Sequence, residues 1–169
     1  MKSLPVVVLL DNIRSAYNVG AIFRTANGAG VEAVVCCGYT PYPLLTGDKR
    51  LKFEAEKVTD AIAKTALGSQ NLPCKHFDEA RQAVEFYRSK GYQIVALEQT
   101  EDSVKLFDFQ PRFPLVLTLG HEVEGTDASL LKLADTVVEI PMHGAKESLN
   151  VSVAAGIALY QLRQTSSRP

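Results

Sequence analysis

Asn18 and Arg24 are the first polar residues whose types and spacing could do chemistry. They lie six residues apart in a segment where Val19, Ile22 and Phe23 have helical spacing. An arginine beside an apolar helix face tends to have a carboxylate or phosphate partner, so Arg24 is a candidate ligand for such a group. The alternative is a helix cap at Asn18 and a solvated guanidinium at Arg24.

Glu122 is a candidate functional carboxylate. It lies between Gly120 and Gly125, just after an apolar run that predicts a strand. Ligands of open α/β sheets sit beyond the carboxyl ends of strands, and glycines allow backbone shapes that other residues avoid. The alternative is a tight loop in which Thr126 or Asp127 caps the next helix.

Ser148 and Asn150 precede the last helical pattern, 151–162. Before them, Pro141 and Gly144 constrain the loop that follows the last predicted strand. Exposed backbone amides at a helix start can form the polar floor of a pocket. The alternative is that Ser148 and Asn150 only cap the helix.

Two other patterns do not predict sites. Residues 28–33 fit the G-x-G-x-x-A dinucleotide pattern, but they end a helix and enter a strand, which is the reverse of the order that such a site needs. His76, His121 and His143 have no spacing typical of metal ligands. We therefore expect neither a dinucleotide site nor a metal.

The elements that must position these residues alternate between strand and helix. Predicted strands cover 5–10, 31–37, 75–77, 92–97, 115–119 and 136–140, and predicted helices cover 17–29, 54–67, 78–90, 126–133 and 151–162. This alternation predicts an α/β fold with a mostly parallel sheet and helices on both faces. We expect residues 1–164 to form one domain and 165–169 to be a disordered tail.

The composition is that of an ordinary globular chain, with 46% hydrophobic and 22% charged residues among 169. The net charge of −1 does not by itself indicate nucleic-acid binding. Cys36, Cys37 and Cys74 form an odd set without CxxC spacing, which favours reduced thiols over disulfides or zinc. The first apolar run is too short for a signal peptide, and no run is long enough to cross a bilayer. We expect a cytoplasmic protein without a membrane partner.

Taken together, the three segments resemble the SpoU (TrmH) family of RNA 2′-O-methyltransferases in the SPOUT superfamily. The matching motifs are NVGAIFRTA at 18–26, LTLGHEVEG at 117–125, and IPMHG followed by ESLNVS within 140–152. They occur in the family's order, and the resemblance spans nearly the whole chain. It implies a SPOUT-type α/β knot, in which the C-terminal part forms a deep trefoil knot. It also implies a homodimer with helices near both termini at the interface, and tRNA or rRNA as the substrate.

The resemblance also implies a cofactor site and a catalytic set. S-adenosylmethionine would be held near Leu97, Gly120, Ile140, Met142, Ser148 and Leu149. The catalytic positions would be Asn18, Arg24, Glu122, Ser148 and Asn150, and all five are present. The implied reaction is an in-line displacement at the sulfonium methyl group by a ribose hydroxyl, which needs positioning and no metal.

Arg24 is often given the role of the base in this family, but a guanidinium rarely gives up its proton. We hypothesise that Arg24 instead clamps an RNA phosphate and stabilises the developing alkoxide. Because the sequence has no basic extension, RNA contacts are expected from Lys49, Arg50 and Lys52, and from the dimer partner; a solvated loop is the alternative for that cluster. Two other functions stay open: a noncatalytic RNA- or nucleotide-binding module with this fold, and a relative that methylates a base.

Overall fold

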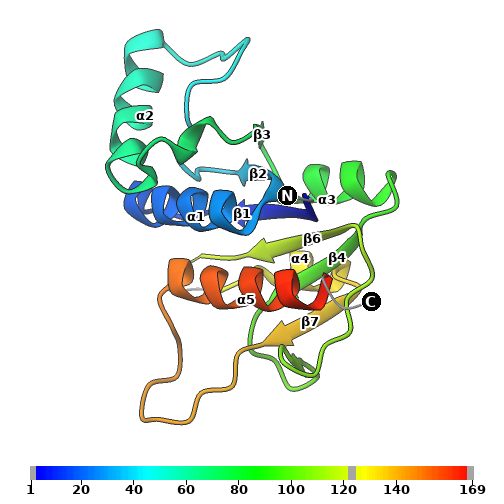
Figure 1. Cartoon of the computed structure of the whole chain (residues 1–169). Coiled ribbons are helices and arrows are strands. Elements are labelled where there is room, and N and C mark those ends of the chain that lie inside the picture. The colour runs from blue at the N-terminus through cyan, green and yellow to red at the C-terminus, as the bar shows by residue number, and fades with distance from the viewer. Residues whose placement is uncertain (1–2, 122–124, 167–169) are drawn as a thin grey trace.

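The computed structural model describes residues 3–121 and 125–166. Its strands are β1 (Leu4–Asp11), β2 (Val31–Cys37), β3 (Cys74–Phe77), β4 (Gln93–Leu97), β5 (Val104–Lys105), β6 (Leu115–Leu119) and β7 (Thr136–Glu139). Its helices are α1 (Ala16–Ala29), α2 (Lys52–Ala66), α3 (Ala80–Arg88), α4 (Ala128–Leu133) and α5 (Val151–Ser166), with a 3-10 turn, η1, at Ser69–Asn71. Figure 1 shows how these elements are arranged.

The seven strands form one sheet in the order β3-β2-β1-β6-β4-β7-β5. All of the strand pairings in it are parallel, which confirms the predicted mostly parallel α/β sheet. After β4 the chain moves out to the edge strand β5, returns to the interior as β6, and then inserts β7 between β4 and β5. This strand order places the ends of β6, β4 and β7 next to one another. The trefoil knot stays a prediction.

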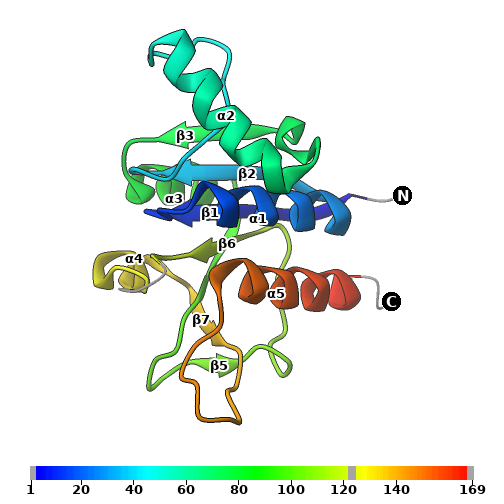
Figure 2. The ribbon, with the colours of Figure 1, turned by 90° about the vertical axis from the view of Figure 1, so that its left-hand side faces the viewer.

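Alternate residues of β1 supply two separate cores. Val6 and Val8 pack under α1, α2 and α5, whereas Val7 and Leu9 pack under α3 and α4. Figure 2 shows the two groups of helices on opposite faces of the sheet. A strand covered on both faces must be apolar at every position, which explains the continuous apolar run from which β1 was predicted.

Gly20 lets α2 approach α1 closely. A Cβ atom on Gly20 would lie 2.1 Å from Thr65 Oγ1 and 2.2 Å from the Ile62 carbonyl oxygen. The Thr65 hydroxyl also donates a hydrogen bond of 2.8 Å to the carbonyl of Tyr17. This close approach of the two helices gives the glycine of the first motif a packing role.

Most helix and strand boundaries differ from the sequence predictions by one to four residues, and a cap, the end of the chain and one strand need comment. Ser15 and not Asn18 caps α1: its side chain accepts a hydrogen bond from the Asn18 N–H at 3.2 Å. Residues 165 and 166 belong to α5, which ends at Ser166, and not to a disordered tail; the Thr165 hydroxyl donates a hydrogen bond of 3.0 Å to the Gln161 carbonyl within the helix. Residues 167–169 lie outside the described residues. The two-residue strand β5 was missed, because both of its side chains are exposed and it has no apolar pattern.

Helices α1 and α5 lie side by side and run in the same direction (Figures 1 and 2). Their first turns are joined by a hydrogen bond from Asn150 to Asn18. Further along, a Cβ atom on Gly156 would touch Thr25 at 3.6 Å. The small residues of α5 serve this packing, since Ala155 and Ala158 are fully buried. The start of α5 is thereby held beside the start of α1.

Candidate functional site

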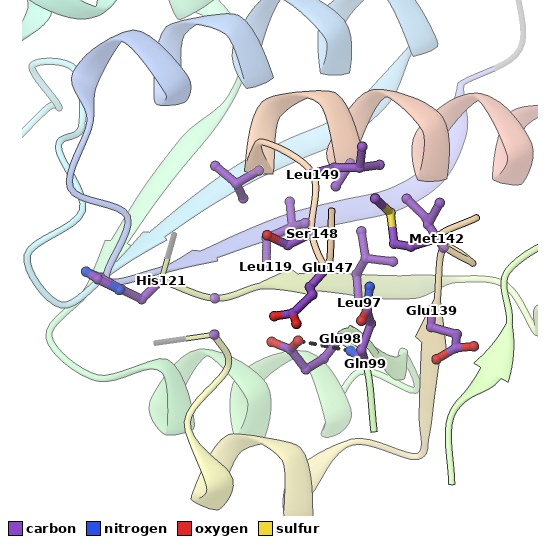
Figure 3. A pocket seen from close by; sticks show the side chains of 15 residues that line it. Leu97, Glu98, Gln99, Leu119, His121, Glu139, Met142, Glu147, Ser148 and Leu149 are labelled. Carbon is purple, nitrogen blue, oxygen red and sulfur yellow. Dashed lines mark hydrogen bonds between the residues drawn. The ribbon is translucent and has the colours of Figure 1, made fainter. Parts of the chain in front are cut away.

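A pocket of about 200 Å³ lies where β4, β6 and β7 end and the loop before α5 begins. Figure 3 shows Leu97, Leu119 and Leu149 forming apolar walls, with Met142 at one end and His121 toward the other. Six residues that the resemblance assigns to the cofactor all line this pocket: Leu97, Gly120, Ile140, Met142, Ser148 and Leu149. Their gathering follows from the sheet order, because parallel strands end at the same edge.

Gly120 allows the chain after β6 to fold back on itself. A Cβ atom at this position would lie 2.5 Å from Thr126 Cα, closer than any side chain tolerates. The backbones of His121 and Gly125 exchange two hydrogen bonds of 3.0 Å, which close the loop. Glu122 lies within this loop but outside the described residues, so its candidate role stays a prediction.

Glu98, which the sequence analysis missed, braces the same loop. One oxygen of its carboxylate accepts the Thr126 N–H at 2.8 Å, and the other accepts the Gln99 N–H at 2.9 Å. A Cβ atom on Gly125 would lie only 2.7 Å from the Glu98 carboxylate. Glu98 directly follows β4, so the rule that sites lie beyond strand ends could have identified it.

The pocket is acidic as well as apolar. Glu98, Glu139 and Glu147 all line it, and Figure 3 shows Glu98 and Glu147 extending into it. Glu139 also accepts a hydrogen bond of 2.7 Å from the Ser103 hydroxyl, which ties the segment after β4 to β7. Carboxylates in a partly enclosed apolar cleft favour a cationic ligand, because low local polarity strengthens charge attraction.

Asn18 and Asn150, two of the candidate catalytic residues, are brought together from positions 132 residues apart. The Asn150 amide nitrogen donates to Asn18 Oδ1 at 3.2 Å. Its oxygen accepts from the backbone N–H of Ser152 at 2.9 Å and from the Ser152 hydroxyl at 2.6 Å. The Asn150 side chain therefore caps α5 and also links it to α1. The predicted capping role is confirmed, and the candidate catalytic role of Asn150 stays a prediction.

Arg24 does not reach the pocket of its own chain. It is exposed on α1 and is not among the pocket's lining residues. No hydrogen bond or ion pair joins it to another residue within 3–121 or 125–166. The structure of one chain thus places Ser148 at the pocket and joins Asn18 to Asn150, whereas Arg24 does not line the pocket.

Asp11, at the end of β1, is a buried carboxylate on the same edge of the sheet. It is 7% exposed. Burial raises its pKa above the usual 3.8, and the charge of Asp127 raises it further. Asp127 caps α4 by accepting hydrogen bonds from the hydroxyl and the N–H of Ser129, which lower the pKa of Asp127.

Arg50 is bound within its own loop. Its guanidinium contacts the Asp48 carboxylate at 2.5 Å and lies 3.5 Å from the centre of the Tyr42 ring. The hydrogen bond from Arg50 lowers the pKa of Asp48. Of the three basic residues expected to contact RNA, Lys49 and Lys52 are exposed and Arg50 is partly buried, and the RNA contacts of all three stay a prediction.

A comparison with known families now decides the relationship. The sequence model of the SpoU rRNA Methylase family matches residues 5–160, which is most of the chain. The chain belongs to the SpoU rRNA methylase family. Membership confirms the resemblance drawn from the three motifs, and solved structures of SpoU and TrmH proteins share the observed fold.

Similar members of the family act on RNA. The chain is 31% identical over 159 residues to the tRNA (guanosine(18)-2′-O)-methyltransferase of Aquifex aeolicus, covering 94% of this chain and 68% of that one. It is 30% identical to a 23S rRNA (guanosine-2′-O-)-methyltransferase of Shewanella oneidensis, covering 97% and 61%. The chain thus spans about two thirds or less of the length of these relatives.

Solved structures agree. The Aquifex aeolicus TrmH/SpoU tRNA-modifying enzyme superposes with a TM-score of 0.79 at 28% identity, covering 97% of this chain and 76% of that one. An AdoMet-bound rRNA methyltransferase from Sinorhizobium meliloti superposes with a TM-score of 0.73 at 26% identity, covering 96% and 60%. Within residues 3–121 and 125–166, no helix is long and apolar enough to span a membrane, and no three potential metal ligands cluster.

Proposed function

We propose that this chain transfers a methyl group from S-adenosylmethionine to a ribose 2′-hydroxyl of tRNA or rRNA. The observation that carries the proposal is the pocket at the ends of β4, β6 and β7, which gathers all six residues that the family resemblance assigns to the cofactor. The relatives named as guanosine 2′-O-methyltransferases support the reaction class. We further propose that residues 1–164, together with the last two residues of α5, act as one cytoplasmic domain.

The pocket's chemistry suits this cofactor. When bound, S-adenosylmethionine supplies an electrophilic methyl group on a positively charged sulfur, together with an ammonium group and an apolar adenine. Leu97, Ile140 and Leu149 offer apolar contact for a ring, and Glu98 and Glu147 offer negative charge for the cationic part. An in-line displacement needs this kind of fixed orientation more than it needs an acid or a metal.

Arg24 completes the proposed site from a second copy of the chain. Arg24 is exposed on α1 and is not among the residues that line the pocket of its own chain. We propose a homodimer in which α1 and α5 lie at the interface and the partner's arginine faces the pocket. There the guanidinium binds an RNA phosphate and stabilises the alkoxide that develops on the ribose oxygen, and the proton leaves to another group or to water.

Methyl transfer into total RNA from labelled S-adenosylmethionine tests the reaction. A 2′-O-methyl group blocks attack of that oxygen on the adjacent phosphate, so after alkaline hydrolysis the label should remain in resistant dinucleotides. Label in ordinary mononucleotides would indicate base methylation. Cofactor binding without any transfer would favour a noncatalytic module.

Arg24→Lys tests the bidentate role, because lysine keeps the charge but loses the planar fork. We expect the rate to fall at least tenfold, or about 1.4 kcal/mol of transition-state stabilisation. Arg81→Lys is the matched control, since Arg81 is an exposed arginine on α3 that pairs only with Glu85 among the described residues. A rate for Arg24→Lys near that of the control would contradict the clamp.

A further inference from the structure

Tyr39 is a large aromatic side chain that the protein leaves exposed beside the pocket. It follows β2, and 58% of its surface is accessible. Its ring lies 6.4 Å from the ring of His121, centre to centre, at an interplanar angle of 80°. His121 lines the pocket and lies toward the end away from Met142 in Figure 3. At this angle the two rings are not stacked face to face, and more than half of the Tyr39 surface stays accessible to other partners.

The turn that carries Tyr39 is fixed by buried hydrogen bonds. Thr40 is 1% exposed, and its hydroxyl donates to the Leu10 carbonyl at 3.1 Å and accepts the Ile13 N–H at 3.0 Å. The Tyr39 N–H itself donates to Asn12 Oδ1 at 3.2 Å. These bonds tie the turn after β2 to the end of β1.

Gly38 makes that attachment close. It has a positive φ of 61°, and a Cβ atom there would lie 2.0 Å from Asn12 Oδ1. Asn12 has a positive φ of 55° as well, a conformation that asparagine tolerates better than most residues. Two residues with positive φ, Asn12 and Gly38, thus help to fix the turn that carries the exposed Tyr39 ring. A ring held in advance loses little conformational entropy when it binds a flat partner.

We propose that Tyr39 is a stacking platform for a nucleobase of the RNA held at this pocket. The inference rests on the proposed function, because a ribose presented to the pocket carries its base, or the neighbouring base, to within reach of the pocket rim. Tyr39 has no charge with which to bind a phosphate, and its exposed ring offers the flat apolar surface that single-stranded bases use. Such stacking tolerates any base, so Tyr39 contributes affinity rather than sequence choice.

Rates and affinities of substituted chains give the first test. Tyr39→Ala should lower kcat/KM for RNA between about 5-fold and about 150-fold, the range for loss of one stacked base, and Tyr39→Phe should restore it. Binding of S-adenosylmethionine, measured by calorimetry, should not change. Phe107→Ala is the matched control, because Phe107 is 56% exposed just after β5, outside the pocket lining, and should leave kcat/KM unchanged.

Fluorescence tests stacking without any need for methyl transfer. The chain has no tryptophan, so Tyr39→Trp introduces a single reporter. Its emission should be quenched by unfractionated tRNA, by rRNA or by polyadenylate, while that of Phe107→Trp should not. Equal quenching of the two variants, or none in either, would overturn the proposal.

Two results separate this inference from the proposed function. Wild-type protein that transfers no label would refute the proposed methyl transfer, and the fluorescence titration would still decide whether Tyr39 stacks on RNA. Full kcat/KM in Tyr39→Ala, in an active enzyme, would refute stacking alone. A change of oligomeric state in Tyr39→Ala, measured by light scattering, would assign the ring to contact between two copies and would also overturn the proposal.

Discussion

Replacing Asn150 separates its role in the fold from its role in the site. The Asn150 side chain caps α5 by accepting the Ser152 N–H at 2.9 Å, and it donates to Asn18 at 3.2 Å. Asn150→Ala removes both bonds. Loss of a helix cap costs about 1 kcal/mol, and loss of one exposed hydrogen bond costs about 0.5 to 1 kcal/mol. We expect unfolding to become easier by about 1.5 to 2 kcal/mol.

Asn150→Asp keeps the first bond and removes the second. An aspartate still accepts the Ser152 N–H, and its negative charge at a helix start is favourable by about 0.3 to 1 kcal/mol. It has no amide N–H to donate to Asn18. We therefore expect stability close to that of the wild type, while methyl transfer falls in both variants, because the amide donor is lost in both.

Urea unfolding and labelled methyl transfer provide the two measurements. A destabilisation of this size corresponds to a fall in melting temperature of roughly 3 to 8 °C for a chain of this length. Asn27→Ala is the control, an exposed asparagine on α1 whose replacement should change stability by less than about 0.5 kcal/mol. Equal destabilisation by alanine and aspartate would refute the capping argument. Full activity in Asn150→Asp would refute the role of the amide donor.

Three further substitutions test the packing, the loop brace and the buried charge. Gly20→Ala should lower the free energy of unfolding by about 1 to 3 kcal/mol, measured in urea, because its Cβ would lie 2.1 Å from a side chain of α2. Gly156→Ala, whose Cβ would have its nearest contact at 3.6 Å, should be neutral or stabilising. Equal effects of the two substitutions would contradict the close packing at Gly20. Glu98→Gln should weaken S-adenosylmethionine binding about tenfold in calorimetry, since one acceptor of the loop brace is lost, whereas the exposed Glu101→Gln should not; unchanged affinity in both would exclude the brace. The raised pKa of Asp11 means that its charge disfavours folding at neutral pH, so Asp11→Asn should stabilise the protein at pH 7. This gain in stability should vanish below the usual pKa of 3.8, where the carboxyl is protonated in both the folded and the unfolded state. A gain that persists in acid would contradict this reasoning.

Much of the fold could be predicted because its strands are buried on both faces. Apart from Asp11 and Thr118, β1 and β6 are apolar, as strands between two helix layers must largely be, and this pattern is visible in the sequence. β5 has two exposed residues and is held at the sheet edge by its pairing with β7. Such a strand leaves no trace in local composition, because its partner is distant in the sequence.

The candidate site was predicted in part for a related reason. Glycines and polar residues directly after strands stand out, and the tight loop with Asp127 as a helix cap, one of the two alternatives for the motif containing Gly120, is present. Glu98 and Tyr39 were not identified. Each follows a strand, but the use of each depends on a residue elsewhere: Thr126 for Glu98, and His121 for Tyr39.

Local chemistry alone accounts for most helices and for the strands other than β5, since apolar periodicity and backbone freedom are properties of neighbouring residues. It also reveals the family, through three motifs that keep their order. The meeting of Asn18 with Asn150, the capture of Arg50 by Asp48, and the separation of Arg24 from the pocket do not follow from it. These depend on which strand lies next to which, and that is decided by packing of the whole chain around two cores.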